Sequence, residues 1–243
     1  MELRGRVALV TGAARRVGRA IAVGLGARGM RVAVHYRSGA DEAAASVAEI
    51  ERSGGAARAF HADLASADAP AALVREVADA FGALDVLVNS AAVMMRTPFG
   101  EVTPESWDAM FALNVRAPFF LVQAAAPRLA ERGGAVVNIA DLAAFETWPG
   151  YIPHGASKAA VVQLTRALAR RLAPGVRVNA VAPGAVLLPD SWSAADGERL
   201  ASTTPLRRLG TPADVVQAVL YLLEADYVTG EILLVDGGRH VRT

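Results

Sequence analysis

The segment "RVALVTGAARRVGRAIAVGLGARG" (residues 6–29) decides the fold. Residues 6–12 are mostly apolar and predict a buried strand, and residues 15–29 have the spacing of a helix that ends near Gly29. Gly12 permits a tight turn between the two, and Gly18 permits close approach of the helix to a ligand. The amino end of such a helix offers free N–H groups to a pyrophosphate, although an ordinary strand-to-helix turn can carry the same two glycines.

The alternation of strand and helix continues along the chain. Apolar strands are predicted at 31–36, 57–63, 83–91, 134–140, 176–184 and 231–238, and helices at 41–55, 68–82, 104–131, 151–173 and 211–225. Strands that are apolar on both faces indicate a parallel sheet covered by helices on both sides. We therefore expect one α/β domain over residues 1–243, with a Rossmann-type doubly wound sheet. Residues 185–210 interrupt the pattern and predict a lid or substrate loop.

The composition is that of a globular chain with a large core. Of the 243 residues, 53% are hydrophobic and 20% are charged, and the net charge of +1 favours neither a nucleic-acid nor a membrane partner. The absence of cysteine excludes disulfides and thiolate metal sites. The first residues lack the features of a signal peptide, and the apolar runs are too short to predict a membrane span. We expect a cytoplasmic protein that acts on a small molecule.

The end of the second strand indicates which dinucleotide the chain binds. An acidic side chain here would bind the ribose hydroxyls of NAD, but the sequence is "HYRS" (35–38). Arg37 and Ser38, with Arg16 across the turn, offer donors to a 2′-phosphate instead. The missing acid and the arginines predict NADP(H), unless Arg37 is only a solvated surface charge.

Polar residues follow the next two strands. Asp63 in "HADL" (61–64) either accepts a hydrogen bond from an adenine amino group or caps the following loop. Asn89, in "VLVNSAA" (86–92), either fixes the adjoining loop beside the ligand or serves plain turn chemistry. His35 and His61 are too far from a cluster of carboxylates to predict a metal site.

Taken together, these motifs resemble those of the short-chain dehydrogenase/reductase family over essentially the whole chain. "TGxxxxxG" (11–18), "NSAA" (89–92), "LNV" (113–115), "GASK" (155–158) and "APG" (182–184) stand in the family's order and spacing. Within the family the chain is most similar to the pteridine reductase and dihydromonapterin reductase branch, because of Arg16, the "HYRS" segment, Asp141 and the ending "DGGRHVR". The cofactor-binding residues that the resemblance implies are Gly12, Arg15, Arg16, Val17, Gly18, Tyr36, Arg37, Ser38, Asp63, Leu64, Asn89, Ser90, Ala91, Lys158, Pro183 and Gly184.

The chain departs from the family at the proton donor. His154 stands thirteen residues after Asp141 and four before Lys158, where the family has its catalytic tyrosine. A neutral imidazole is a poor acid, so His154 must be protonated to replace a phenol; Lys158 would disfavour that charge and Asp141 would favour it. The resemblance implies a catalytic set of Asn114, Asp141, His154 and Lys158, with Asn114 in a proton relay. Two alternatives stay open: His154 only fills a pocket beside Asp141, or Tyr151 takes over as the acid.

The substrate side of the site also departs from the branch. Met94 falls where a pteridine reductase has the phenylalanine that stacks on the pterin, and Leu187 or Leu188 falls near the threonine that contacts the nicotinamide amide in many members. The resemblance implies that Met94, Arg96, Trp148 and Trp192 line the substrate mouth, although scattered tryptophans are more often core residues.

Three functions are compatible with these residues. The first is an NADPH-dependent reductase of a small carbonyl or pteridine-like substrate. The second is a catalytically weak NADP-binding sensor or regulator, and the third is a reductase of a 3-oxoacyl thioester or a sugar. The resemblance also implies a homotetramer or homodimer through the helices at 104–131 and 151–173, whose alanine-rich faces are equally compatible with packing on the sheet. The terminal residues Arg239 to Arg242 would reach a neighbouring subunit or form a solvated tail.

Overall fold

The centre of the molecule is a parallel sheet between two layers of helices. The computed structural model describes residues 1–188 and 192–241. Its sheet has seven strands in the order β3-β2-β1-β4-β5-β6-β7, and every neighbouring pair is parallel. The strands are β1 (Val7–Val10), β2 (Arg31–Tyr36), β3 (Ala56–His61), β4 (Val86–Asn89), β5 (Ala135–Ile139), β6 (Arg177–Pro183) and β7 (Ile232–Val235). The predicted α/β, Rossmann-type sheet is confirmed, with most strands a few residues shorter than expected.

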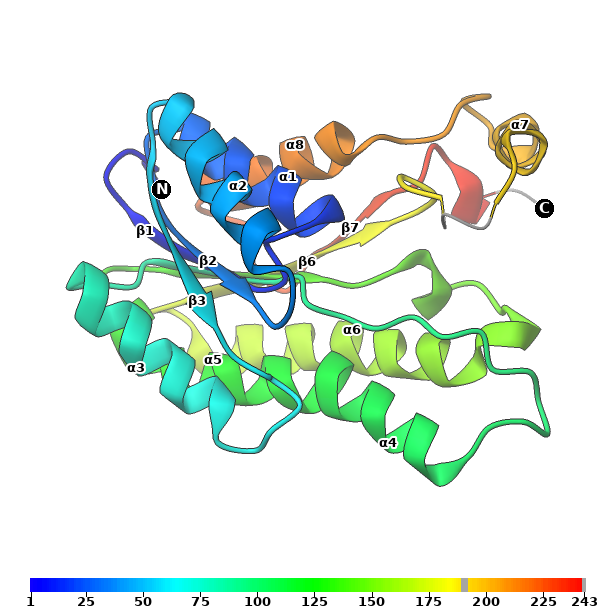
Figure 1. Ribbon diagram of the computed structural model, residues 1–243, viewed down its shortest axis with the longest axis horizontal. Helices are drawn as coiled ribbons and strands as arrows, with labels where there is room; N and C mark the ends of the chain where they lie inside the picture. The colour runs from blue at the N-terminus through cyan, green and yellow to red at the C-terminus, as the bar shows by residue number, and fades with distance from the viewer. Residues whose placement is uncertain (189–191, 242–243) are drawn as a thin grey trace.

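Helices cover both faces of this sheet. On one face lie α1 (Arg16–Ala27), α2 (Ala40–Arg52) and α8 (Pro212–Glu224), and on the other lie α3 (Ala69–Phe81), α4 (Pro104–Phe111), α5 (Ala117–Glu131) and α6 (Ile152–Leu172) (Figure 1). Two large apolar clusters form the core, one on each face: Ile21, Leu25 and Leu222 belong to the first, and Leu73, Leu121 and Val178 to the second. Burial of both faces explains why the central strands β1, β4, β5 and β6 lack the alternating polar residues of a half-exposed strand.

The strand order positions the functional site. The chain leaves β1 toward β2 and β3, and then returns to place β4 on the other side of β1. In parallel α/β sheets, ligands bind at the carboxyl ends of the strands, where the order reverses in this way. Here that point lies between the ends of β1 and β4, next to Gly12 and Ser90.

The helix predicted at 104–131 is interrupted in the structure. Residues Ala112–Arg116 form one π-helical turn between α4 and α5. Single π turns of this kind often occur at functional sites. At its centre, the buried Asn114 side chain bonds the main chain of Val93 and the hydroxyl of Ser157. These contacts offer a physical reason for the distortion, which periodicity alone does not reveal.

The same run of helix also bears on the expected absence of a membrane span. Among the described residues, Pro104–Glu131 is long and apolar enough to pass a length-and-hydropathy test for a membrane span, with 39% of the tested window buried. Core helices of soluble proteins pass the same test, and α5 packs against α3.

Residues 185–210 are not the continuous loop that was predicted. They contain a helix, α7 (Ala194–Thr203), which begins with a capping box between Ser193 and Asp196. Pro189, Asp190 and Ser191 lie outside the described residues. The Ser193–Asp196 pair is a recognisable helix start in the sequence, but Gly197 in the second turn weakens the helical pattern.

Candidate active site

The turn from β1 into α1 has the shape of an anion-binding loop. Gly12 has a φ of 66°, and a Cβ at Gly18 would lie 2.3 Å from the carbonyl oxygen of Gly12. The N-cap residue of α1, Arg15, makes no side-chain capping bond, so no N-cap side chain occupies the first N–H groups of the helix. Thr11 Oγ1 accepts hydrogen bonds from the main-chain N–H groups of Ser90 and Ala91, at 2.9 and 3.0 Å, and ties the ends of β1 and β4 together. This frame suits a dinucleotide pyrophosphate.

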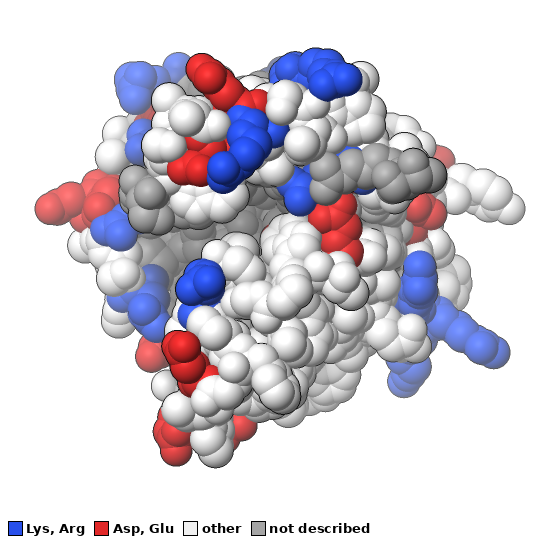
Figure 2. Space-filling view, turned by 90° about the vertical axis from the view of Figure 1, so that its right-hand side faces the viewer, with Lys and Arg blue, Asp and Glu red and all other residues white. Residues whose placement is uncertain are grey.

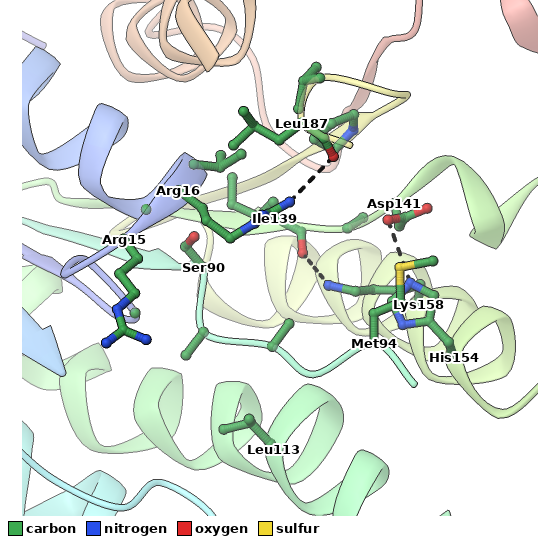
Figure 3. A pocket seen from close by; sticks show the side chains of 18 of the residues that line it. Arg15, Arg16, Ser90, Met94, Leu113, Ile139, Asp141, His154, Lys158 and Leu187 are labelled. Carbon is green, nitrogen blue, oxygen red and sulfur yellow. Dashed lines mark hydrogen bonds and ion pairs between the residues drawn. The ribbon is translucent and has the colours of Figure 1, made fainter. Parts of the chain in front are cut away.

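Two cationic side chains border the cavity near the end of β2. Arg15 and the exposed Arg37 both line it, and Arg15 forms an exposed ion pair with Glu42 at the start of α2. Arg16 points elsewhere: its Nη2 donates to the carbonyl oxygens of Leu187 and Leu188, at 3.3 and 3.4 Å (Figure 3). The predicted pairing of Arg16 with Arg37 at a 2′-phosphate is therefore not the arrangement of the structure, where Arg15 is the second cation near the end of β2.

Asp141, His154 and Lys158 converge on the same cavity from β5 and α6 (Figure 3). The carboxylate oxygen Oδ2 of Asp141 lies 3.5 Å from Nε2 of His154, whose side chain is 2% exposed. Among the described residues, neither ring nitrogen of His154 has a hydrogen-bond partner. Buried polar atoms without partners are rare, and this ring also lines the cavity, which makes it a candidate for contact with a bound molecule.

Lys158 is buried at the floor of the cavity. Its Nζ donates to the carbonyl oxygen of Ile139 at 2.8 Å. Burial lowers the pKa of the Lys158 ammonium below its ordinary value, and the nearby Asp141 carboxylate partly opposes this. Asp141 is itself oriented by a bond from the Ala143 N–H to its Oδ1, at 2.8 Å.

Asn114 supports this group from outside the cavity. Its amide nitrogen donates to the Val93 carbonyl and to Ser157 Oγ, and its oxygen accepts from the Val93 N–H. Ser157 Oγ donates in turn to the carbonyl oxygen of His154. Both amide protons of Asn114 are used in these bonds, which join the segment after β4 to α6.

Among the described residues, the face around the cavity shows no single-sign charge patch. Figure 2 shows mostly neutral side chains on it, with Arg scattered among Asp and Glu. Within residues 1–188 and 192–241, no group of three His, Cys, Asp or Glu side chains is placed to hold a metal ion.

Comparison with known proteins agrees with this geometry. The family profile described as enoyl-(acyl carrier protein) reductase matches residues 12–240. A solved short-chain dehydrogenase/reductase from Serratia marcescens superposes with a TM-score of 0.93 at 35% identity, covering 99% of this chain and 100% of that one. The chain belongs to the short-chain dehydrogenase/reductase family. It is therefore an oxidoreductase, and its substrate is a small molecule.

Two further members of the short-chain dehydrogenase/reductase family are similar along nearly the whole length. The 3-oxoacyl-(acyl-carrier-protein) reductase FabG of Staphylococcus aureus is 37% identical over 240 residues, which is 96% of this chain and 98% of that protein. The angucycline C-6 ketoreductase LanV, solved with bound NADP, has a TM-score of 0.90 at 36% identity and covers 99% of this chain and 98% of its own.

Most of the residues predicted to bind cofactor in this short-chain dehydrogenase/reductase line one cavity of about 450 Å³. They are Gly12, Arg15, Arg16, Val17, Gly18, Arg37, Leu64, Ser90, Ala91, Lys158, Pro183 and Gly184. Four others lie outside its lining. Tyr36 packs edge-on against His61, Asp63 caps its own loop through Ala65, Asn89 donates to Asn138, and Ser38 is exposed.

Of the residues predicted to line the substrate mouth, Met94 lines the cavity, whereas Arg96, Trp148 and Trp192 do not. Met94 lines the cavity and is 46% exposed. Arg96 lies near Gly150, and Trp192 is 42% exposed without lining the cavity. Trp148 and Tyr151 belong to a separate groove, where their rings meet edge-to-face, so the structure does not place Tyr151 as a substitute acid.

The C-terminal segment folds back onto this groove. Arg239 forms an ion pair with Glu146 at 3.3 Å and lies over the Trp148 ring, with 15% of its side chain exposed. The solvated tail, one of the two alternatives predicted for Arg239 to Arg242, does not describe Arg239; the reach to a neighbouring subunit stays a prediction. Arg242 lies outside the described residues.

Several cavity residues were not predicted as part of the site. They are His35, Ala92, Leu113, Ile139, Ala140, Val186 and Leu187. Leu187 was noted only because it falls near the position at which many family members have a threonine that contacts the nicotinamide amide. The apolar members give no chemical signal in the sequence. His35 does give such a signal, because it is a polar residue in the mostly apolar strand at 31–36.

Proposed function

We propose that this short-chain dehydrogenase/reductase uses NADPH to reduce a ketone. The observation that carries the proposal is the convergence of Asp141, His154 and Lys158 on the cavity that also contains the Gly12–Gly18 turn. Arg15 and Arg37 near the end of β2, without an acidic residue at that position, fit a 2′-phosphate. When bound, NADPH supplies the hydride.

The protein's own residues would handle the proton. We propose that His154, as an imidazolium, donates its proton to the carbonyl oxygen of the substrate as the hydride arrives at carbon. Asp141, 3.5 Å away, stabilises the positive charge of the imidazolium, and the Lys158 ammonium opposes it. Lys158 holds the nicotinamide ribose, while Asn114 and Ser157 keep the first turns of α6 in place.

For the substrate, we propose a 3-oxoacyl thioester or a related ketone. The relatives named as 3-oxoacyl-(acyl-carrier-protein) reductase and as angucycline C-6 ketoreductase support this class. The lining also supports it, because Met94, Leu113, Val186 and Leu187 offer flexible apolar contacts and no aromatic face for a pterin. A pteridine remains the second candidate, supported by Arg16 and Asp141.

A substrate panel tests this choice. With saturating NADPH, we expect kcat/KM for an acetoacetyl thioester to exceed that for a dihydropteridine by about tenfold or more, since the pterin lacks a stacking partner. Initial rates of NADPH oxidation measure both. A preference for the dihydropteridine would overturn the thioester assignment and leave the reductase assignment standing.

The cofactor preference is tested at Arg37. Replacing Arg37 by alanine is expected to raise KM for NADPH by about tenfold through loss of a charge-assisted bond to the 2′-phosphate, with KM for NADH unchanged. Arg58→Ala is the matched control, because Arg58 lies on β3 and does not line the cavity. An equal change for both cofactors would contradict a 2′-phosphate contact.

A second candidate function is a dinucleotide-binding protein with little turnover. The specific observation in its favour is that the His154–Asp141 contact at 3.5 Å is not a hydrogen bond. A scaffold that kept the cavity but lost its acid would bind NADPH and reduce nothing. Tyrosine at position 154 separates the two candidates, as set out in the Discussion.

We further propose that residues 1–243 form one domain, with the region around α7 acting on the substrate side. We also propose a cytoplasmic homotetramer or homodimer that uses the helices at 104–131 and 151–173. Exposed aromatic residues on the first of these, Trp107 and Phe120, support an interface there.

A further inference from the structure

His35 connects the dinucleotide turn to the edge of the sheet. It lies near the end of β2, is 2% exposed, and lines the cavity. Its Nδ1 accepts a hydrogen bond from the Gly12 N–H at 3.1 Å, and its Nε2 lies 3.1 Å from the carbonyl oxygen of Ala62, just after β3. One side chain therefore joins β1, β2 and β3 at the place where the cavity opens.

These two partners fix the form of the imidazole. The Gly12 N–H can only donate, so Nδ1 must carry a lone pair, and the Ala62 carbonyl can only accept, so Nε2 must carry the proton. The ring is thus neutral, in a single tautomer. Burial lowers the pKa of His35 to about 4, opposed by the bond to Ala62 and by the Asp63 carboxylate, while His61 lowers it further. With Arg15 and Arg37 on the rim, these groups keep the ring neutral at ordinary pH.

The bond to Gly12 acts on the pyrophosphate-binding turn itself. Gly12 has a positive φ, its carbonyl packs against Gly18 of α1, and its Cα side packs against Ala91. Without an acceptor at Nδ1, the partly buried Gly12 N–H would lose its protein partner and the turn could relax. We propose that His35 is a positioning residue that holds the Gly12 turn in the shape that receives the dinucleotide pyrophosphate. The inference rests on the proposed binding of NADP(H).

Two substitutions, His35→Asn and His35→Gln, distinguish a role of His35 in positioning the Gly12 turn from a purely structural role. Asparagine places its Oδ1 near the position of Nδ1 and keeps the bond to Gly12, whereas glutamine places its Nε2 near the ring Nε2 and keeps only the bond to Ala62. Both remove the imidazole. We expect His35→Asn to bind NADP⁺ within about twofold of wild type, and His35→Gln to bind about tenfold more weakly.

The measurement is the Kd of NADP⁺ at pH 7.5 by titration calorimetry, with adenosine 2′-monophosphate as a probe that lacks the pyrophosphate. We expect equal Kd values for that probe in all three proteins. Should His35→Gln not fold, as judged by circular dichroism, His35→Leu replaces it with the same expected loss.

Three results would overturn the inference. If asparagine weakens NADP⁺ binding as much as glutamine, or more, then the bond to Ala62 or general packing is what matters. If both variants bind as wild type does, His35 does not position the turn. If wild type itself binds no NADP⁺, both the inference and the proposed function fail, which is distinct from loss in the variants alone.

Discussion

Replacing His154 by alanine is expected to lower kcat for ketone reduction by about a hundredfold or more, because positioned general acids contribute factors of that size. The imidazole faces the cavity with both ring nitrogens unpartnered among the described residues, and the Asp141 carboxylate lies beside it. The Kd of NADP⁺ is expected to stay within about threefold of wild type, because the pyrophosphate turn is at the other end of the cavity. Steady-state rates at saturating NADPH give the first quantity and calorimetric titration the second.

The matched control for His154→Ala is Tyr151→Phe. Tyr151 precedes α6 by one residue but faces the Trp148 groove, so removal of its hydroxyl is expected to leave kcat unchanged. Wild-type kcat in His154→Ala would contradict the role of His154. A loss of kcat in Tyr151→Phe with none in His154→Ala would assign the proton to the tyrosine instead.

The largest expected effect on stability is at Asp85, far from the cavity. Its carboxylate has no exposed surface, accepts from the Val7 N–H at 2.8 Å, and forms ion pairs with Arg6 and Arg132. Asp85→Ala is expected to lower the free energy of unfolding by about 3 kcal/mol, because it leaves a buried N–H without a partner and removes two charge-assisted bonds. Urea unfolding at pH 7 measures the change.

The Asp85 carboxylate also makes the free energy of unfolding depend on pH. Burial raises the pKa of Asp85, but the Val7 N–H and the guanidinium groups of Arg132 and Arg6 outweigh it and hold the pKa below its ordinary value of 3.8. The stabilisation by Asp85 is therefore complete above pH 3.8 and is lost as the pH falls through the lower pKa of the folded state.

The control for Asp85→Ala is Glu224→Ala, which breaks the exposed ion pair with Arg28. It should lower the free energy of unfolding by less than about 1 kcal/mol. Equal losses in the two variants would contradict the account of Asp85.

The sheet and its ligand-binding edge could be predicted because they depend on patterns that are local in sequence. Buried parallel strands are apolar throughout, and the glycines of the β1–α1 turn stand at fixed spacing. The convergence of Asp141, His154 and Lys158 followed from the resemblance. The π turn at Ala112–Arg116 could not be predicted, because contacts from Asn114 to Val93 and Ser157 accompany it and are not encoded in periodicity.

Most of the remaining differences between the predicted site and the observed one come from the direction in which individual side chains point. Arg15 and Arg16 are adjacent, and only the backbone decides which one faces β2: Arg16 has a φ of 53°, and its side chain crosses to Leu187. Trp148 is close to the site in sequence but faces Glu146 and Arg239. His35 was considered only as a metal ligand, because the two main-chain groups it joins are 23 and 27 residues away in sequence.

The most direct test of the central claim compares wild type with His154→Tyr in NADPH oxidation by an acetoacetyl thioester, from about pH 5 to 9. Histidine and tyrosine side chains differ as acids, because an imidazolium in general loses its proton at a lower pH than a phenol does. We expect wild-type kcat to decline with rising pH and the tyrosine variant to stay active to a higher pH. A wild type that is inactive at every pH, beside an active tyrosine variant, or two identical flat profiles, would contradict the role of His154 as the working acid.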